Sequence, residues 1–124
     1  MANEVLRYEH IDELDTYFAD LKKYKRRLSV EEEKELSLRI QNGDKEALDT
    51  LVKHNLRFVV AIAKSYRSRT DVSFADLISE GNMGLYHAAE KYDGRRETKF
   101  ITYAVWWIKN SINEIIKDYA SNNE

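Results

Sequence analysis

Aromatic and amide side chains alternate with cations in the C-terminal stretch from Lys99 to Tyr119. Aromatic rings can stack on unpaired bases, amides can hydrogen-bond to base edges, and cations can bind phosphates. Two adjacent indoles could also close off the end of a duplex by stacking on it. Trp and Tyr are equally favoured as anchors of protein interfaces. The residues alone therefore predict a binding surface for either unpaired nucleic acid or a protein.

A helix over residues 99–119 would position these side chains. At about 100° per residue, one side of the helix is an apolar stripe, formed by Ile101, Ala104, Val105, Ile108, Ile112, Ile115 and Tyr119. The opposite side carries Phe100, Tyr103, Trp106, Trp107, Asn110, Asn113, Glu114 and Lys117, with Lys99 and Lys109 nearby. Exposed aromatic area of this extent is unfavourable unless something binds it. We therefore expect the second side to have a partner.

Composition predicts a single all-α domain. The chain has 124 residues, no Pro, four Gly and abundant helix-forming residues. The absence of Cys excludes disulfides and thiol chemistry, and neither a signal peptide nor a membrane-spanning run is visible. We therefore expect a cytoplasmic protein without membrane contact.

Apolar residues at helical spacing predict four further helices, over about 11–24, 30–41, 44–68 and 73–92. Ser29 with Glu32, Asp44 and Ser73 would cap three of them. The result is a compact bundle of about five helices, of which the third and the last are long. We expect residues 1–43 to form an N-terminal helical hairpin and residues 44–124 to form the core of the domain.

Three features of these helices have more than one interpretation. Asn55 interrupts the apolar stripe of the third helix and is either a satisfied core amide or a ligand-binding residue. Gly81 and Gly84 each cost a helix about 1 kcal/mol relative to Ala, a cost tolerated where a neighbouring helix approaches closely. The five cations of Lys22–Arg27 suit a helix C-terminus, where the dipole favours positive charge, or contact with phosphate.

Several other functions are disfavoured by the sequence. The net charge is −4 over residues 1–50 and +2 over residues 51–124, so tight binding of the chain alone to duplex DNA is not expected. His10, His54 and His87 lie on separate predicted helices without partners at ligand spacing, so we expect no metal site. Nucleophile motifs and phosphate-binding loops are missing too. We expect no enzymatic activity and no cofactor.

Three segments, in order and at consistent spacing, resemble the core domain of the housekeeping-type bacterial sigma factors. They are residues 55–66 (NLRFVVAIAKSY), 76–85 (DLISEGNMGL) and 99–109 (KFITYAVWWIK). The resemblance extends back through residues 28–33 and 39–44 and so covers nearly the whole chain. It implies a helical initiation factor that binds core RNA polymerase and the minus-ten element of promoters.

The resemblance assigns the outer side of the fourth helix to polymerase binding. From the residues alone, this side is an ordinary solvated face. In the family, the matching positions dock on the clamp helices of the largest polymerase subunits. The positions in this chain are Asp76, Ser79, Glu80, Asn82 and Tyr86.

The resemblance also assigns roles in DNA binding. Tyr103 matches the residue that stacks on the first flipped non-template adenine, in a pocket shaped by Tyr92, Asp93, Arg96 and Thr102. Trp106 and Trp107 match the wedge at the upstream edge of the melted DNA. Asn55 and Arg57 match positions that hold downstream unpaired bases. With the face residues found above, the predicted DNA-binding set is Asn55, Arg57, Tyr92, Asp93, Arg96, Lys99, Phe100, Thr102, Tyr103, Trp106, Trp107, Lys109, Asn110 and Asn113.

The chain departs from the family pattern at several positions. Asn110 and Asn113 stand where Gln and Thr usually read the duplex. Asn can also contact adenine, but it is shorter than Gln, so the resemblance does not determine which base these positions prefer. Glu114 replaces a residue that is usually basic, and Thr98 replaces a common aromatic. On the polymerase side, Ser79 and Tyr86 replace a Gln and a long aliphatic residue.

The sequence ends before the helix-turn-helix domain that in the family reads the minus-thirty-five element. The chain is thus either a fragment or a minimal, for instance phage-encoded, protein that relies on a partner for upstream recognition. The leading hypothesis is a sigma-type initiation module. The alternative is a sigma mimic or regulatory protein that occupies the clamp site, or is held by a partner protein, without opening DNA. A third interpretation is an RNA-binding helical module.

Overall fold

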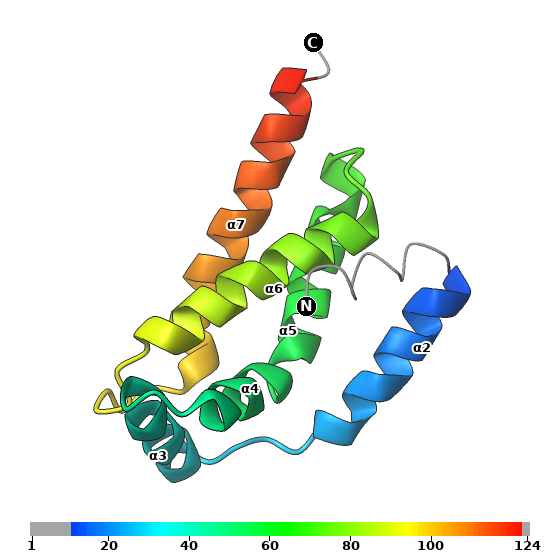
Figure 1. The fold of residues 1–124 in the computed structure, drawn as a ribbon. Helices are drawn as coiled ribbons and strands as arrows, with labels where there is room; N and C mark the ends of the chain where they lie inside the picture. The colour runs from blue at the N-terminus through cyan, green and yellow to red at the C-terminus, as the bar shows by residue number, and fades with distance from the viewer. Residues whose placement is uncertain (1–10, 123–124) are drawn as a thin grey trace.

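A computed structural model describes residues 11–122, which form helices joined by short connections, without strands (Figure 1). The prediction of an all-α fold is confirmed. Two 3-10 turns, Lys22–Tyr24 and Arg67–Arg69, accompany the α-helices. The α-helices are α2 (Ile11–Leu21), α3 (Val30–Gln41), α4 (Lys45–Lys53), α5 (Leu56–Tyr66), α6 (Phe74–Lys91) and α7 (Phe100–Asn122).

The predicted helix starts are confirmed by side-chain caps. The Ser29 hydroxyl accepts the backbone N–H of Glu32 at 3.0 Å, and the Glu32 carboxylate accepts the backbone N–H of Ser29 at 2.9 Å. Asp44 and Ser73 accept the N–H three residues further on, each at 3.1 Å. Gly43, with φ of 88°, follows the end of α3 in the left-handed conformation that glycine adopts most readily.

The prediction of one long third helix is wrong, because a turn at His54 and Asn55 divides it into α4 and α5. Asn55 has φ of −121° and is buried, and its side-chain Nδ2 donates to the Leu51 carbonyl oxygen at 2.8 Å. An amide that bonds to the backbone four residues earlier competes with helical hydrogen bonding. Asn55 is therefore a core amide that closes the end of α4, and the apolar spacing alone did not show the break.

The expected hairpin of the first two helices is not formed. An extended connection separates α2 from α3, and α2 packs on α5 whereas α3 packs on α4 (Figure 1). Both helices thus cover the core, at separate places.

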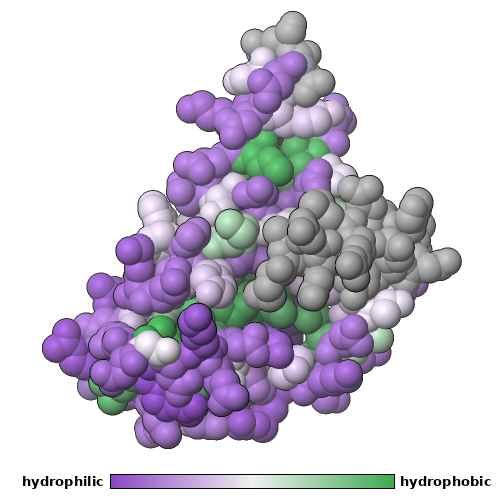
Figure 2. Space-filling model, viewed as in Figure 1, coloured by the Kyte–Doolittle hydropathy of each residue, from purple (hydrophilic) through white to green (hydrophobic). Residues whose placement is uncertain are grey.

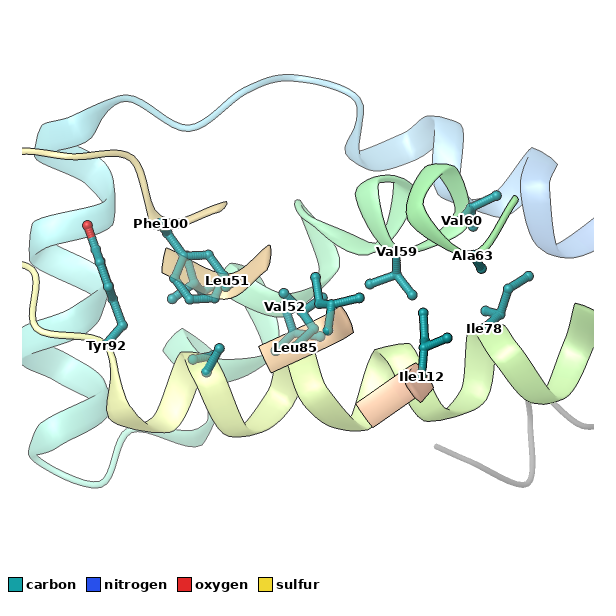
Figure 3. Close-up of a cluster of buried hydrophobic side chains, with 14 of the residues drawn as sticks. Leu51, Val52, Val59, Val60, Ala63, Ile78, Leu85, Tyr92, Phe100 and Ile112 are labelled. Atoms are coloured by element: carbon teal, nitrogen blue, oxygen red, sulfur yellow. The ribbon is translucent and has the colours of Figure 1, made fainter. Parts of the chain in front are cut away.

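The core lies between α6 and α7, with α4 and α5 packed on α6. Figure 3 shows its buried side chains as one cluster, with Tyr92 and Phe100 at one end and Ile78 and Ala63 at the other. The close approach predicted at the helical glycines is confirmed. A Cβ at Gly81 would lie 2.6 Å from Val59 Cγ1, and one at Gly84 would lie 2.5 Å from the Trp107 carbonyl oxygen.

The apolar stripe of α7 is buried over most of its length, with Ala104, Ile108 and Ile112 fully enclosed. Tyr119 was expected on this stripe, but it lies beyond the core and is 40% exposed. The face in Figure 2 is mainly hydrophilic and carries only small hydrophobic patches. None of the helices in residues 11–122 combines the length and the apolar character needed to cross a membrane.

Candidate nucleic-acid interface

The aromatic side chains at the end of α6 and the start of α7 form a continuous row from the core to the surface. We call it the aromatic row; its rings are Tyr92, Phe100, Tyr103, Trp107 and Trp106. The Tyr92 ring lies 5.1 Å from Phe100 and 5.7 Å from Tyr103, and Tyr103 lies 6.2 Å from Trp107. Trp106 meets Trp107 edge-on at 5.4 Å and is 63% exposed. Each accessible ring thus packs against another ring of the row.

The expectation that Phe100 lies on the exposed side is wrong, since its side chain is fully buried. At the first turn of the helix, the core extends round to this position and packs the ring edge-on against Tyr92. Tyr92 is buried too, and its hydroxyl donates to the Thr98 carbonyl oxygen at 2.8 Å. Burial raises the pKa of Tyr92 above its ordinary value of 10.0. The two residues support Tyr103 without offering a surface of their own.

The loop before α7 places a cation beside Tyr103. Asp93 pairs with Arg95 at 2.8 Å, and hydrogen bonds from Arg95 lower the pKa of the Asp93 carboxyl to about 2. Arg96 then turns back, with Cζ 5.5 Å from the Tyr103 ring centroid. Ser37 of α3 anchors the loop, since its hydroxyl accepts the Gly94 N–H at 3.0 Å. A base stacked on Tyr103 would lie within the field of Arg96.

A hollow of about 170 Å³ lies where the α4–α5 turn meets the start of α7. We call it the first hollow. It brings together four predicted DNA-binding residues from distant parts of the sequence: Asn55, Arg57, Lys99 and Thr102. The remainder of its lining consists of Arg27, Leu28, Glu33, His54, Phe58 and Ile101. Cations around an apolar wall suit an unpaired nucleotide.

Glu33 is a residue of this site that sequence reasoning missed. Its carboxylate is buried; Oε1 accepts the Phe100 backbone N–H at 3.0 Å, and Oε2 lies 3.5 Å from Lys99 Nζ. Lys99 also donates to the Leu28 carbonyl oxygen. Glu33 thus caps the N-terminus of α7 from another helix, where a negative charge is favourable. Within the run Glu31-Glu32-Glu33, only knowledge of the packing distinguishes this residue.

Arg57 is held in place beneath the connection between α2 and α3. Its Nη1 donates to the Tyr24 carbonyl oxygen at 3.0 Å, and its Cζ lies 4.8 Å from the Phe58 ring centroid. His54 makes a similar contact, with Nδ1 3.0 Å from the Arg26 carbonyl oxygen. The cations of the first hollow are therefore largely fixed by the chain itself.

Further along α7, the predicted face is exposed as expected, including Lys109, Asn110, Asn113 and Glu114. It becomes acidic beyond Asn113, because Glu114 and Asp118 lie near Asp76 and Glu80 of α6. Burial raises the pKa of Glu80 above 4.5, and these three carboxylates raise it further. In this part of the face, the exposed Lys117 lies between Glu114 and Asp118 in the sequence, so the face carries more negative than positive charge here.

The predicted polymerase-binding residues of α6 divide into two groups. Tyr86 is exposed, and Asp76 and Glu80 are partly exposed, as expected. The expectation that Ser79 and Asn82 lie on the open side is wrong, since both are buried. Asn82 Nδ2 donates to the Tyr17 hydroxyl at 3.2 Å, which ties α6 to α2.

In the part of the chain that the structure describes, no three His, Asp or Glu side chains are grouped to hold a metal ion. His87, expected to lack a carboxylate partner, has Nδ1 3.6 Å from Glu90 Oε1. A single His with one carboxylate on the exposed side of α6 is an ordinary surface pair.

Comparison with known proteins identifies similar families and relatives. The family model described as Sigma-70 region 2 matches residues 51–121, and Sigma-70 factor, region 1.2, matches residues 12–46. The RNA polymerase sigma factor SigA of a Bacillus species is 53% identical over 93 residues, which are 75% of this chain and 24% of that protein. The protein of the same name from Clostridium acetobutylicum is 52% identical over equal shares. The chain spans about a quarter of the length of these curated relatives.

Proposed function

This chain belongs to the sigma-70 family, and from that premise we propose that it is a transcription-initiation module without catalytic activity of its own. It would bind core RNA polymerase in the cytoplasm and capture unpaired non-template bases of the minus-ten promoter element. The observation that carries the proposal is the aromatic row, which ends at the surface in Tyr103, Trp107 and the largely exposed Trp106.

Tyr103 is the proposed stacking residue for the first flipped base. Its ring is packed against Tyr92 and Trp107 and lies beside Arg96. Extruding a base from a duplex costs a few kcal/mol. A slot whose walls are already ordered loses little side-chain entropy when it binds the base, so more of the stacking energy offsets that cost.

The bases that follow would enter the first hollow. Arg57, Lys99 and Thr102 line it, and Arg57 is already oriented by its bond to the Tyr24 carbonyl. Asn55 is buried and would form part of the wall of the first hollow. Trp106, which is 63% exposed, and Trp107, which packs edge-on against it, are the proposed wedge against the upstream duplex.

The proposed polymerase-binding surface is the accessible part of α6. Asp76 and Glu80 would meet basic groups of the clamp helices of the largest polymerase subunit, and Tyr86 would supply apolar contact area next to the exposed Met83. Surface carboxylates mainly set orientation and association rate, while the aromatic side chain adds affinity.

Two alanine variants test the proposal. We expect Tyr103→Ala and Trp106→Ala to abolish promoter opening while core polymerase binding is retained. Tyr119→Ala is a matched control, because it removes an exposed aromatic ring of the same helix outside the aromatic row. Binding is measured by co-migration with core polymerase and opening by permanganate reactivity of unpaired thymines. Normal opening by both variants would refute the proposed role of the row.

The acidic end of α7 favours a second candidate, a sigma mimic that occupies the clamp site without opening DNA. Glu114 and Asp118 would oppose the phosphates of an upstream duplex. Core polymerase mixed with a labelled single-stranded minus-ten oligonucleotide separates the candidates. Polymerase binding without oligonucleotide binding favours the mimic, and oligonucleotide binding by a chain that does not bind polymerase favours an RNA-binding helical module.

A further inference from the structure

The accessible part of α6 is a single strip of side chains that runs along the helix. Between Asp76 and Glu90, the exposed and partly exposed residues recur at helical spacing, and every other residue of this stretch is buried. We call this surface the α6 strip; its members are Asp76, Glu80, Met83, Tyr86, His87 and Glu90. Any partner that binds the outer side of α6 has to contact these residues.

Only two members of the α6 strip are large and apolar. Met83 is 45% exposed and Tyr86 is 37% exposed. They are three positions apart, so their side chains are neighbours on the helix surface. The other members are three carboxylates and one histidine. Since buried apolar anchors supply most of the affinity of an interface and rim charges supply little, the affinity of the strip for a partner depends on these two side chains.

Met83 differs from Tyr86 in carrying a thioether, which peroxides oxidise to a sulfoxide where they can reach it. The exposure of Met83 gives them access to the sulfur. In this step the sulfur lone pair forms the new S–O bond and the O–O bond of hydrogen peroxide breaks. The departing hydroxide takes the remaining proton and leaves as water. The sulfur is thereby oxidised, the peroxide is reduced, and a flexible apolar side chain becomes polar.

We propose that Met83 is a reversible oxidation site through which peroxide lowers the affinity of this chain for core RNA polymerase. This inference rests on the proposed function, which places the α6 strip against the polymerase. When the interface forms, the sulfoxide oxygen passes from water into an apolar contact, and this transfer opposes binding. The ionised carboxylates on either side of Met83, Glu80 and Glu90, only accept hydrogen bonds, so they offer the sulfoxide oxygen no donor.

The oxidation of Met83 depends on whether the chain is bound. The thioether is accessible in the free chain, and the polymerase covers it in the proposed complex. Oxidation therefore acts on free chains, while chains already bound to polymerase are protected. Peroxide prevents new assembly without dismantling existing complexes, and methionine sulfoxide reductases restore the free chains.

This effect is separate from oxidative damage to the fold. Met83 is neither a member of the hydrophobic core nor packed against it, in the part of the chain that the structure describes. The residues that follow it, Gly84 and Leu85, are the ones that face the interior. A sulfoxide at Met83 thus changes the surface of α6 and leaves the packing of α6 on α7 intact.

The test treats the full chain with hydrogen peroxide, removes the reagent, and titrates the chain against untreated core polymerase. Mass spectrometry shows whether the peptide that contains Met83 has gained one oxygen atom. Circular dichroism and tryptophan fluorescence show that the fold and the indoles are unchanged. Met83→Leu is the resistant variant, because Leu keeps the apolar volume, and Met83→Gln is the permanently polar one. Leu38→Gln is the control, since it removes an exposed apolar side chain of α3, outside the α6 strip.

We expect the oxidised wild type and Met83→Gln to bind core polymerase about tenfold more weakly than the untreated wild type. Reductase treatment should restore the oxidised protein. Met83→Leu should keep its affinity with and without peroxide, and Leu38→Gln should bind like the wild type. Core polymerase added before the peroxide should slow the oxidation of Met83.

Three results would overturn the inference. They are unchanged affinity of a chain shown to carry the sulfoxide at Met83, an equal loss of affinity in peroxide-treated Met83→Leu, and equal rates of oxidation in the free and the bound chain. Each of these leaves the proposed function intact, because the untreated chain still binds. If the untreated wild type does not bind core polymerase, the proposed function is refuted, and the oxidation site with it.

Discussion

Replacing Gly84 by Ala should separate the two helices that position the aromatic row. A Cβ at this residue would lie 2.5 Å from the carbonyl oxygen and 2.9 Å from the carbonyl carbon of Trp107. Both atoms belong to the backbone of α7 and cannot rotate away. The third near atom, Ser111 Oγ at 2.8 Å, is in a side chain and can move. The helices must therefore shift relative to each other.

The size of the effect follows from two opposing terms. Overpacking a core costs about 1–3 kcal/mol, and contact with immobile backbone places this case near 3. Ala gains about 1 kcal/mol over Gly in helix propensity. The net loss is about 2 kcal/mol in the free energy of unfolding, which for a domain of this length lowers Tm by about 8 °C. Displacement of Trp107 should also weaken oligonucleotide binding.

Thermal unfolding followed by circular dichroism measures the stability loss, and tryptophan fluorescence reports the movement of the indoles. Adding Ser111→Ala removes the overlap with the Ser111 hydroxyl, so the double variant should recover only a small part of the Tm. A Gly84→Ala protein with unchanged or higher Tm would refute the argument. Full recovery in the double variant would show that the Ser111 hydroxyl, rather than the backbone of α7, sets the helix spacing.

Three further substitutions test other contacts of the fold. Glu33→Ala should lower the free energy of unfolding by about 2 kcal/mol, since the Phe100 N–H loses a charged acceptor, while Glu33→Gln should cost less; equal losses in urea unfolding would contradict the capping role. Glu80→Gln should raise Tm at pH 7, because burial and neighbouring carboxylates disfavour the ionised Glu80 in the folded state and so raise its pKa. The gain should vanish as the pH falls below 4.5, where Glu80 is protonated in both the folded and the unfolded states. A gain in Tm that persists in acid would contradict this explanation. Asn55→Ala should cost about 1 kcal/mol in urea unfolding through its bond to Leu51, and no loss would contradict its role at the end of α4.

Local rules predicted the helix starts and a site where two helices approach closely. Ser29, Asp44 and Ser73 cap their helices through bonds to residues three positions away. Such contacts depend only on nearby sequence. The close helix approach at Gly84 was predictable for another reason. A glycine within a helix lowers helix stability relative to Ala, and this cost is tolerated where a neighbouring helix packs closely. These features needed no knowledge of the distant parts of the chain.

Contacts between distant segments were not predictable in the same way. The helical period assigned Phe100 to the open side, but the first turn of α7 is enclosed by Tyr92 and by Glu33, which is 67 residues away in sequence. The helical period likewise assigned Asn82 to the solvated side of α6, but its side-chain amide donates to the hydroxyl of Tyr17, 65 residues away in sequence. A helical wheel describes one helix, and both errors arose where a second element covers it.

The candidate site depends on the meeting of the two parts of the chain that match sigma-70 regions. Glu33 lies in the part matched by region 1.2, and Lys99 and Phe100 lie in the part matched by region 2. Because the buried carboxylate caps α7 at the point where the aromatic row begins, the orientation of the row is set by both parts together. The same α2–α3 segment that leads to Glu33 also contacts Arg57. A change in either part should therefore alter the proposed binding of single-stranded DNA, even where none of the proposed DNA-binding side chains is replaced.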